Sequence, residues 1–337
     1  MKRVAMYVIA VVFLLLNWKD LGFPETGKLA EDIMKEEGLI TEEEYNAAQK
    51  TRIFGSEKML PQTEQPKSSY KIQDQHQIEL GTEISHITYK EPGVMQEKGI
   101  MYGVDGSYVY RTQVTEYPKG IDIWMLKIDG RFSYGQVDYV NSGTMDNIDD
   151  YILEFRGLWG CDISVLKLKP STLTPFIGIG YRYLNDDFAG TTSTGALGYE
   201  RESNYIYSPV GIEVVTPLKN GWSIGATTEY DIFWHGKQKS NLSDARLYNP
   251  VTGYYRYDDI ENSQDSGYGV RGSIKLQKKA KKLDFVIEPY IRYWNIKESK
   301  QTTTSTISEN GLWIITGTFV EPDNNSTEIG CKLAVKF

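Results

Sequence analysis

The sequence predicts an all-β protein: a transmembrane, antiparallel, up-and-down β-barrel of about ten strands, with twelve as the alternative, preceded by a short helical hairpin. Three observations predict this class. Apolar and polar residues alternate from residue 76 to the end, long connections alternate with short ones, and the chain carries 24 Tyr, 7 Trp and 31 Gly. Such alternation is typical of strands with one apolar face, and aromatic side chains favour strands.

Composition excludes several other classes of protein. The net charge of −8 disfavours general nucleic-acid binding, because contacts to phosphate need clustered Lys and Arg. A mean hydropathy of −0.43 does not fit a bundle of membrane helices. With two Cys and three His, the chain is expected to have no disulfide scaffold, no Cys/His metal site and no cofactor.

Residues 1–22 are predicted to be a signal peptide. Lys2 and Arg3 precede an apolar run over 4–16, which is shorter than the ~20 residues that a membrane-spanning helix needs. No small-x-small cleavage pattern follows the run, so the cleavage site is open and an uncleaved anchor is the alternative. Either way, the chain is expected to be exported.

Residues 28–52 are predicted to form a helical hairpin. Gly38 ends the first helix, and Thr41 with Glu44 forms a capping box that starts the second. The segment GLITEEEY resembles the SHOCT motif and similar pieces at the N-termini of some bacterial porins. A solvated hairpin is expected, and self-association through 28–52 is the alternative. Residues 53–75 are polar with two Pro and are predicted to be a linker.

Residues 76–337 are predicted to form the barrel. Ten segments alternate with period two and are the expected strands: 78–84, 100–110, 124–134, 151–163, 173–181, 206–214, 222–232, 268–276, 285–293 and 329–337. A soluble sandwich would share this alternation, so the connections decide between the two architectures.

Long and short connections alternate along the predicted barrel. Long loops are expected at 91–98, 138–150, 184–204, 235–266 and from about 297, and short turns at 113–120, 167–171, 216–221 and 278–282. This asymmetry is typical of outer-membrane barrels, and an even strand count places both termini at the periplasmic, short-turn side. The turns are basic, whereas the long loops are acidic. Solvated loops are expected, with divalent-cation bridging to lipopolysaccharide as the alternative.

Aromatic residues fall where two interfacial girdles would lie, and the predicted girdle comprises Trp124, Trp159, Tyr181, Trp222, Tyr230 and Tyr293. The chain ends EIGCKLAVKF, in which Leu333, Val335 and Phe337 share one face. This ending resembles the C-terminal assembly signal of Gram-negative outer-membrane β-barrels. The resemblance covers about 76–337. It implies an outer-membrane location, contact with membrane lipid and lipopolysaccharide, and recognition by the barrel-assembly machinery, but no specific activity.

The opposite face of the strands carries nearly balanced charges. The predicted lumen network comprises Glu79, Glu83, Asp105, Lys127, Asp129, Arg131, Glu154, Arg156, Arg182, Glu213, Glu229, Arg271, Glu288, Arg292, Glu328 and Lys332. A barrel of about eight strands is filled by its own side chains, and ten strands lie near that end of the range. Opposite charges in such a narrow space should pair, so we expect a closed or very narrow lumen.

Three functions remain open from the sequence. The first is a non-enzymatic barrel that serves envelope structure, adhesion or ligand binding; the second is a narrow or gated pore for small solutes. The third is a surface protease that resembles the omptins. Omptins are ten-stranded barrels in which a His–Asp pair faces an Asp pair. By parity, His235 is predicted to face the lumen with Asp231, and Asp186 and Asp187 could supply the second pair.

Overall fold

The computed structural model describes residues 75–113, 121–163 and 171–337. The predicted signal peptide, the helical hairpin and all but the last residue of the predicted linker lie outside the described residues. The turns predicted at 113–120 and 167–171 also fall largely outside them.

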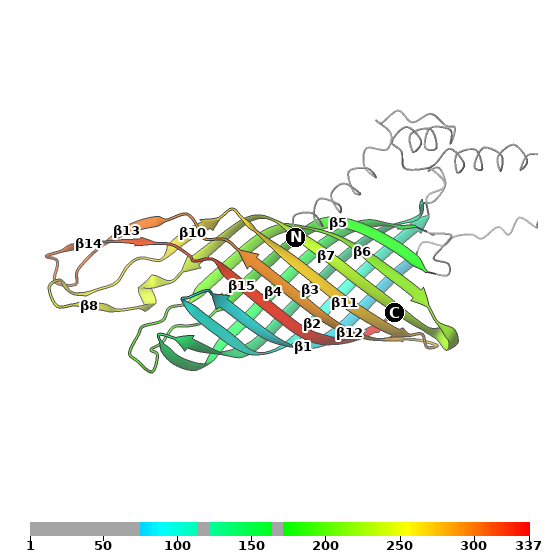
Figure 1. Cartoon of the computed structure of the whole chain (residues 1–337), viewed down its shortest axis with the longest axis horizontal. Coiled ribbons are helices and arrows are strands. Elements are labelled where there is room, and N and C mark those ends of the chain that lie inside the picture. Colours follow the sequence, from blue (N-terminus) through cyan, green and yellow to red (C-terminus); the bar gives the residue numbers. More distant parts are fainter. Residues whose placement is uncertain (1–74, 114–120, 164–170) are drawn as a thin grey trace, which may run out of the picture. The chain divides into compact units, whose positions relative to one another are not determined.

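Ten antiparallel strands form a closed ring (Figure 1). In chain order they are β1 (Gln75–Glu91), β2 (Met95–Gln113), β3 (Ile121–Asn141), β4 (Gly143–Ile163), β5 (Thr172–Asp186), β6 (Arg201–Pro217), β7 (Trp222–Ser240), β11 (Gly267–Lys278), β12 (Asp284–Ile296) and β15 (Asn324–Lys336). Each strand pairs with the next in this order, and β15 pairs back with β1. The predicted ten-stranded barrel is therefore confirmed, and the twelve-stranded alternative is wrong.

The outward faces of these strands carry the predicted apolar residues. Exposed aliphatic and aromatic side chains run around the barrel from Leu80 and Val104 through Ile128, Phe155 and Ile179. A soluble protein would bury such residues, whereas a barrel in lipid presents them to hydrocarbon. Ring closure pairs every strand, so no free sheet edge has to be solvated there.

The six residues of the predicted girdle all lie on strands of the ring. Trp124 and Trp159 stack with ring centroids 4.8 Å apart, near the ends of β3 and β4 that face the short turns. Tyr230 and Tyr293 both contact Tyr268, at centroid distances of 5.9 and 6.1 Å. Aromatic side chains therefore cover neighbouring strands in continuous stretches, as expected at a membrane interface.

The ring has two different ends. Short turns join strands at the end that holds Gln75 and Phe337, which we call the turn end; the other is the loop end. Phe337 exchanges backbone hydrogen bonds with Ile78, at 2.8 and 3.3 Å, so the last residue closes the seam between β15 and β1. The turn between β6 and β7 contains the short 3-10 helix η2 (Lys219–Gly221).

Two predicted long loops are wrong. Most of 91–98 and 138–150 belongs to strands, and β1–β2 and β3–β4 turn over only a few residues at the loop end. The backbone at Gly143 has φ +92°, which favours glycine in the second of these turns. The outward side chains here are polar, so their sequence no longer shows an apolar face, yet backbone pairing continues beyond the level of the lipid.

The long connections at the loop end contain further hairpins. The β7–β11 connection holds the 3-10 helix η3 (Leu242–Asp244), β8 (Leu247–Asn249), β9 (Gly253–Tyr255) and β10 (Ile260–Gln264), and the β12–β15 connection holds β13 (Thr302–Ile307) and β14 (Ile314–Phe319). β8 pairs with β9, β13 pairs with β14, and β10 pairs with the loop-end residues of β7. Within the described residues no helix is long and apolar enough to span a membrane.

Ring closure predicts heat-modifiable migration. Unboiled protein should run faster than boiled protein on SDS gels, because a closed hydrogen-bonded cylinder has no edge from which to unravel. Identical migration of the two samples would contradict a stable closed ring.

The seam predicts a special role for the last residue. Deletion of Phe337, or Phe337→Ser, should lower the amount of inserted barrel several-fold, because its exposed ring lies on the outward face beside β1. Lys336→Ser is the matched control, since its side chain points inward. Equal membrane levels for the three variants would contradict this role.

Candidate functional site: the filled lumen

The middle of the lumen is filled by six charged residues, which we call the arginine layer: Arg131, Arg271, Arg292, Glu83, Glu154 and Glu328. They come from six different strands, and their formal charges cancel. Parity places all six inward, and the side chains of Arg131 and the three glutamates are almost fully buried. Burying ions costs several kcal/mol each, so such a layer is stable only when every charge is matched.

Arg131 on β3 is the centre of the arginine layer. Its guanidinium donates to Glu154 at 2.9 Å, to Glu83 at 3.0 Å and, through two nitrogens, to Glu328 at 2.9 Å each. Glu328 lies on β15, which β1 and β2 separate from β3 in the ring. Fork-shaped bonding of this kind is the strongest ion-pair geometry available to a protein.

Two more arginines complete the arginine layer. Arg292 donates to Glu328 at 2.9 Å and to Glu83 at 3.3 Å. Arg271 on β11 makes two bonds to Glu154 on β4, at 2.5 and 2.9 Å, and a third to Asp231 at 2.7 Å. The layer therefore links strands that are not neighbours in the ring, β3 with β15 and β4 with β11.

A smaller cluster lies just toward the turn end of this layer. Arg156 bonds Asp129 at 2.8 Å and Glu229 at 2.7 Å, and Lys127 lies 3.5 Å from Asp129. Glu229 is on β7 and Arg156 on β4, so this pair also bridges strands that are not neighbours.

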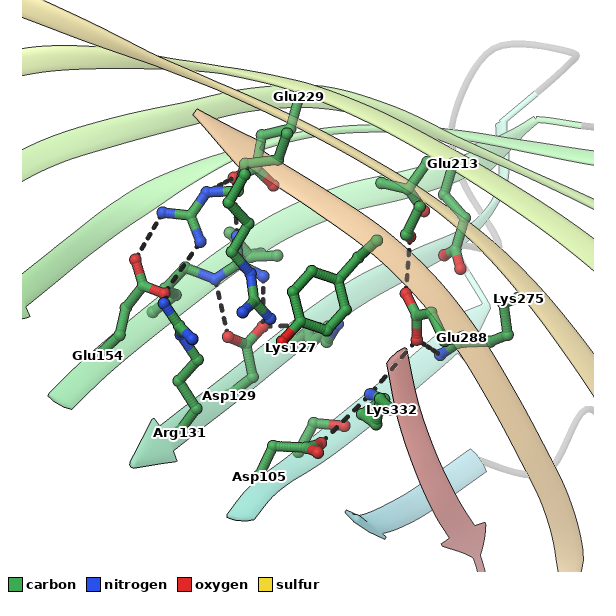
Figure 2. A pocket seen from close by; sticks show the side chains of 18 of the residues that line it. Asp105, Lys127, Asp129, Arg131, Glu154, Glu213, Glu229, Lys275, Glu288 and Lys332 are labelled. Carbon is green, nitrogen blue, oxygen red and sulfur yellow. Dashed lines mark hydrogen bonds and ion pairs between the residues drawn. The ribbon is translucent and has the colours of Figure 1, made fainter. Parts of the chain in front are cut away.

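Further toward the turn end, Lys332 and Lys275 form ion pairs with several acids (Figure 2). Lys332 lies 2.6 Å from Glu79, 3.2 Å from Asp105 and 3.3 Å from Glu288, and Lys275 lies 3.2 Å from Glu79. Here the packing is looser. Two adjoining cavities of about 130 and 310 Å³ occupy this half of the lumen.

The predicted residues do not all pair equally well. Glu213 reaches only Arg111, at 4.0 Å. Arg182 makes no ion pair with any described residue: it is 2% exposed, its Nε has no hydrogen-bond partner, and its guanidinium lies over the ring of Trp294 at 5.4 Å. The other fifteen members of the predicted network each make at least one ion pair.

A second charged cluster, which the sequence analysis missed, lies at the loop end around Arg201. Arg201 bonds Glu91 at 2.7 Å, Glu97 at 3.2 Å and Asp186 at 2.5 Å. Tyr89 lies under the guanidinium, and its hydroxyl is 3.2 Å from a carboxyl oxygen of Glu91 and from one of Glu321, between which its single O–H is shared. Asp186 and Asp150, which were expected on surface loops, line the same small cavity inside the barrel.

We call this group of Glu91, Glu97, Asp150, Asp186, Glu321 and Arg201 the loop-end cluster. It lies beyond the lipid-facing belt, because the outward residues at its level include the exposed Lys90 and Lys98, and a charge facing hydrocarbon is costly. Five acids face one arginine. Burial, together with Asp186, raises the pKa of Glu97 to about 8; burial, together with Glu91, raises the pKa of Glu321 to about 8.

Apolar side chains fill the space between the arginine layer and the loop-end cluster, which the sequence analysis also missed. One group contains Ile87, Met101, Val137 and Ile152. A second consists of Tyr205, Tyr207, Phe233, Trp294 and Ile296. These residues alternate with the outward ones and could have been found by reading the inward positions for apolar as well as charged residues. They make the loop-end half a packed core.

The predicted orientation of His235 is wrong. A register shift between Ile206 and Tyr207 pairs Tyr207 with Phe233 and Ile206 with His235, so Trp234 bulges and parity reverses beyond it. His235 therefore lies outward and half exposed, 3.3 Å from Asp265, while Asp231 is buried against Arg271. The predicted pairing of His235 with Asp231, on which the protease alternative depends, is therefore not formed.

The loop-end hairpins have a small core of their own. Leu242, Tyr257 and Ile260 are buried, and partly buried residues pack against them: Tyr199, Leu247, Tyr255, Ile315 and Phe319. Figure 1 shows β8, β13 and β14 beyond the ring at this end. The hairpins are thus packed against each other rather than loose. Among the described residues, no group of three His, Cys, Asp or Glu side chains has the geometry to hold a metal ion.

The closed ring, its apolar outward belt and its charged interior define a β-barrel of the outer-membrane class. No protein-family model matches the sequence, and no curated protein matches it.

Solved structures of the same general architecture align over most of the chain. The outer membrane protease OmpT from Escherichia coli aligns at 10% identity and TM-score 0.46, covering 78% of this chain and 96% of that chain. The toluene transporter TodX from Pseudomonas putida aligns at 10% identity and TM-score 0.32, covering 77% and 89%. The transport unit of the autotransporter AIDA-I from E. coli aligns at 9% identity and TM-score 0.32, covering 86% and 97%. The class assignment follows from ring closure and the belt alone.

Proposed function

We propose that this protein is a non-enzymatic outer-membrane barrel with a closed lumen, which holds its loop-end hairpins at the cell surface for envelope structure, adhesion or ligand binding. The observation that carries the proposal is the continuous filling of the barrel. The matched ion pairs of the arginine layer fill the middle of the lumen, and a packed apolar core fills it between that layer and the loop-end cluster.

The closed lumen also supports the hairpins mechanically. β10 continues the pairing of β7 beyond the ring, and Asn262 on β10 donates to the backbone carbonyls of Lys300 and Phe319 at 3.0 and 3.2 Å. A packed ring end is a rigid base for such contacts. Long, ordered structure at one end of a plugged barrel is the arrangement expected for display rather than for conduction.

A narrow pore for small solutes is the second candidate. The two cavities in the turn-end half, about 130 and 310 Å³, favour it, because they provide a wet chamber that stops at the arginine layer. To conduct, that layer and the apolar core above it would both have to open.

Surface display is tested by cleavage on intact cells. A protease site inserted between Asn310 and Gly311, in the β13–β14 turn, should be cut from outside, while the same site in the η2 turn should be cut only after the outer membrane is permeabilised. Cleavage in the opposite order would place the loop end in the periplasm and overturn the proposal.

A further inference from the structure

The far end of the hairpins is apolar although the hairpins already have a core. Six residues, which we call the paired tip, project outward: Tyr248, Val251, Ile307, Leu312, Trp313 and Ile314. Leu312 and Ile314 are each 77% exposed and Val251 is 70% exposed, values above any other large apolar residue that the structure describes. Such a surplus of exposed apolar residues marks an interaction surface.

The paired tip is built as one unit. The turn after β13 contacts β9: Glu309 donates its backbone N–H to the carbonyl of Tyr254 at 2.9 Å, and Asn310 reaches the carbonyl of Thr252 at 3.4 Å. Arg246 bonds Glu309 at 2.5 and 2.8 Å and stacks over the ring of Tyr254 at 4.0 Å. These bonds join the two hairpins side by side at their ends.

The turn that presents Leu312 and Trp313 is locked by its own hydrogen bonds. Ser308 N–H donates to the carbonyl of Trp313 at 2.9 Å, and Asn310 Oδ1 accepts from the N–H of Leu312 at 3.0 Å. Gly311 takes φ +73°, which a side chain would disfavour. The apolar residues are therefore held outward in advance, and little order has to be imposed on binding.

Polarity changes with distance from the end in the order of a bilayer interface. Aliphatic side chains stand at the turns, Trp313 and Tyr248 stand beside them, and uncharged Ser–Thr pairs follow on the stalk, with Thr303–Thr318 at 3.1 Å and Ser305–Thr316 at 2.8 Å. Aromatic rings prefer the headgroup level, next to buried aliphatic groups. The barrel's own lipid-facing wall combines the same residue types.

Charge selects the kind of surface. Glu309 is the acid at the paired tip and is paired with Arg246, whereas Arg256 beside them is exposed, bonds only the carbonyl of Ser243 and makes no ion pair with a described residue. At the paired tip itself, entering an interface therefore strands no unpaired acid, and Arg256 can meet an anionic headgroup. The exposed Asp258 and Asp259 follow Arg256 on the way back toward the ring. The hairpin β13–β14 alone extends the chain by about 20 Å, which separates the paired tip from the belt in the protein's own membrane.

We infer that the paired tip docks onto a second lipid bilayer, one with an anionic surface, by inserting Leu312, Ile314 and Trp313 at the level of the headgroups. This deepens the proposed display function by naming what is bound.

The test uses the full-length barrel in nanodiscs of neutral lipid and separate vesicles of phosphatidylcholine with phosphatidylglycerol. Wild type should float with the vesicles, and Leu312→Ser with Ile314→Ser should reduce co-flotation about tenfold or more. Val94→Ser is the matched control, because Val94 is an exposed apolar residue in the separate β1–β2 turn at the same end. Brominated lipid in the vesicles should quench tryptophan fluorescence of wild type but not of Trp313→Phe.

Absence of vesicle binding would overturn the inference, as would binding that the double variant leaves unchanged. Tip-dependent self-association or capture of a protein without vesicle binding would also overturn it and assign the paired tip to a protein partner. Heat-modifiable migration confirms that each variant is folded. The nanodisc assay does not depend on the orientation of the barrel in the cell, so a negative result there would contradict docking and leave the proposed surface display unaffected. Cleavage from the periplasmic side would contradict surface display without testing docking.

Discussion

Arg131→Ala is expected to destabilise the barrel by about 3–5 kcal/mol, because it removes the one cation that bonds Glu83, Glu154 and Glu328 together. Of the arginine layer, Arg292 and Arg271 would then remain to pair with three buried carboxylates. The measurement is denaturant unfolding of the refolded barrel in detergent. The loss of heat-modifiable migration reports the unfolded fraction.

The matched control for this variant is Lys237→Ala, which removes an ion pair with Glu261 whose two side chains are more than half exposed. Exposed pairs contribute at most about 1 kcal/mol, so its unfolding midpoint should stay near that of wild type. If Arg131→Ala and Lys237→Ala unfold together, the arginine layer does not hold the lumen closed.

Stability at the loop end is expected to fall as pH rises from 5 to 9, with a total change of about a few kcal/mol. The pKa of Glu97 is raised to about 8 from its ordinary value of 4.5, and Glu321 behaves alike. A carboxyl whose pKa is raised in the folded state favours folding when it is protonated. Its contribution to stability is therefore complete below pH 4.5 and is lost as the pH rises through about 8. Above that pH, repulsion with Glu91 and Asp186 should loosen the cluster, which should lower the amide-exchange protection factors in β2 and β6.

Glu97→Gln separates this effect from general alkaline destabilisation. It keeps the shape of the side chain but cannot ionise, so the fall in stability between pH 5 and 9 should shrink. Glu309→Gln, an exposed acid at the paired tip, should leave the pH profile unchanged. A wild-type profile that is flat, or that rises with pH, would contradict the role of the loop-end cluster.

The outward half of the barrel was predictable from the sequence because strand parity fixes which face a residue takes. Val104, Ile128 and Phe155 lie outward as alternation requires. Parity fails where a residue is inserted, and His235 shows this: the bulge at Trp234 reverses the two faces, and no local feature of the sequence marks it.

Partners across the lumen were less predictable. Alternation predicts that Arg131 and Glu328 both face inward. Their contact, between residues 197 positions apart, depends on how β3 and β15 are staggered in the ring, and the sequence of one strand does not encode that stagger. Asp186 and Asp150 look like residues of acidic loops in the sequence. The strands that carry them extend beyond the lipid, where outward side chains are polar and the apolar–polar alternation is lost. The apolar core around Met101 was missed because only the charged inward positions were considered.

Single-channel recording of the wild-type barrel in a planar bilayer tests the central claim most directly. Barrels shown to be folded by heat-modifiable migration should give little steady conductance at neutral pH, because the arginine layer and the apolar core above it leave no continuous water path. A wild-type conductance as large as that of a general porin would contradict the closed lumen, and the solute pore would then be the better account.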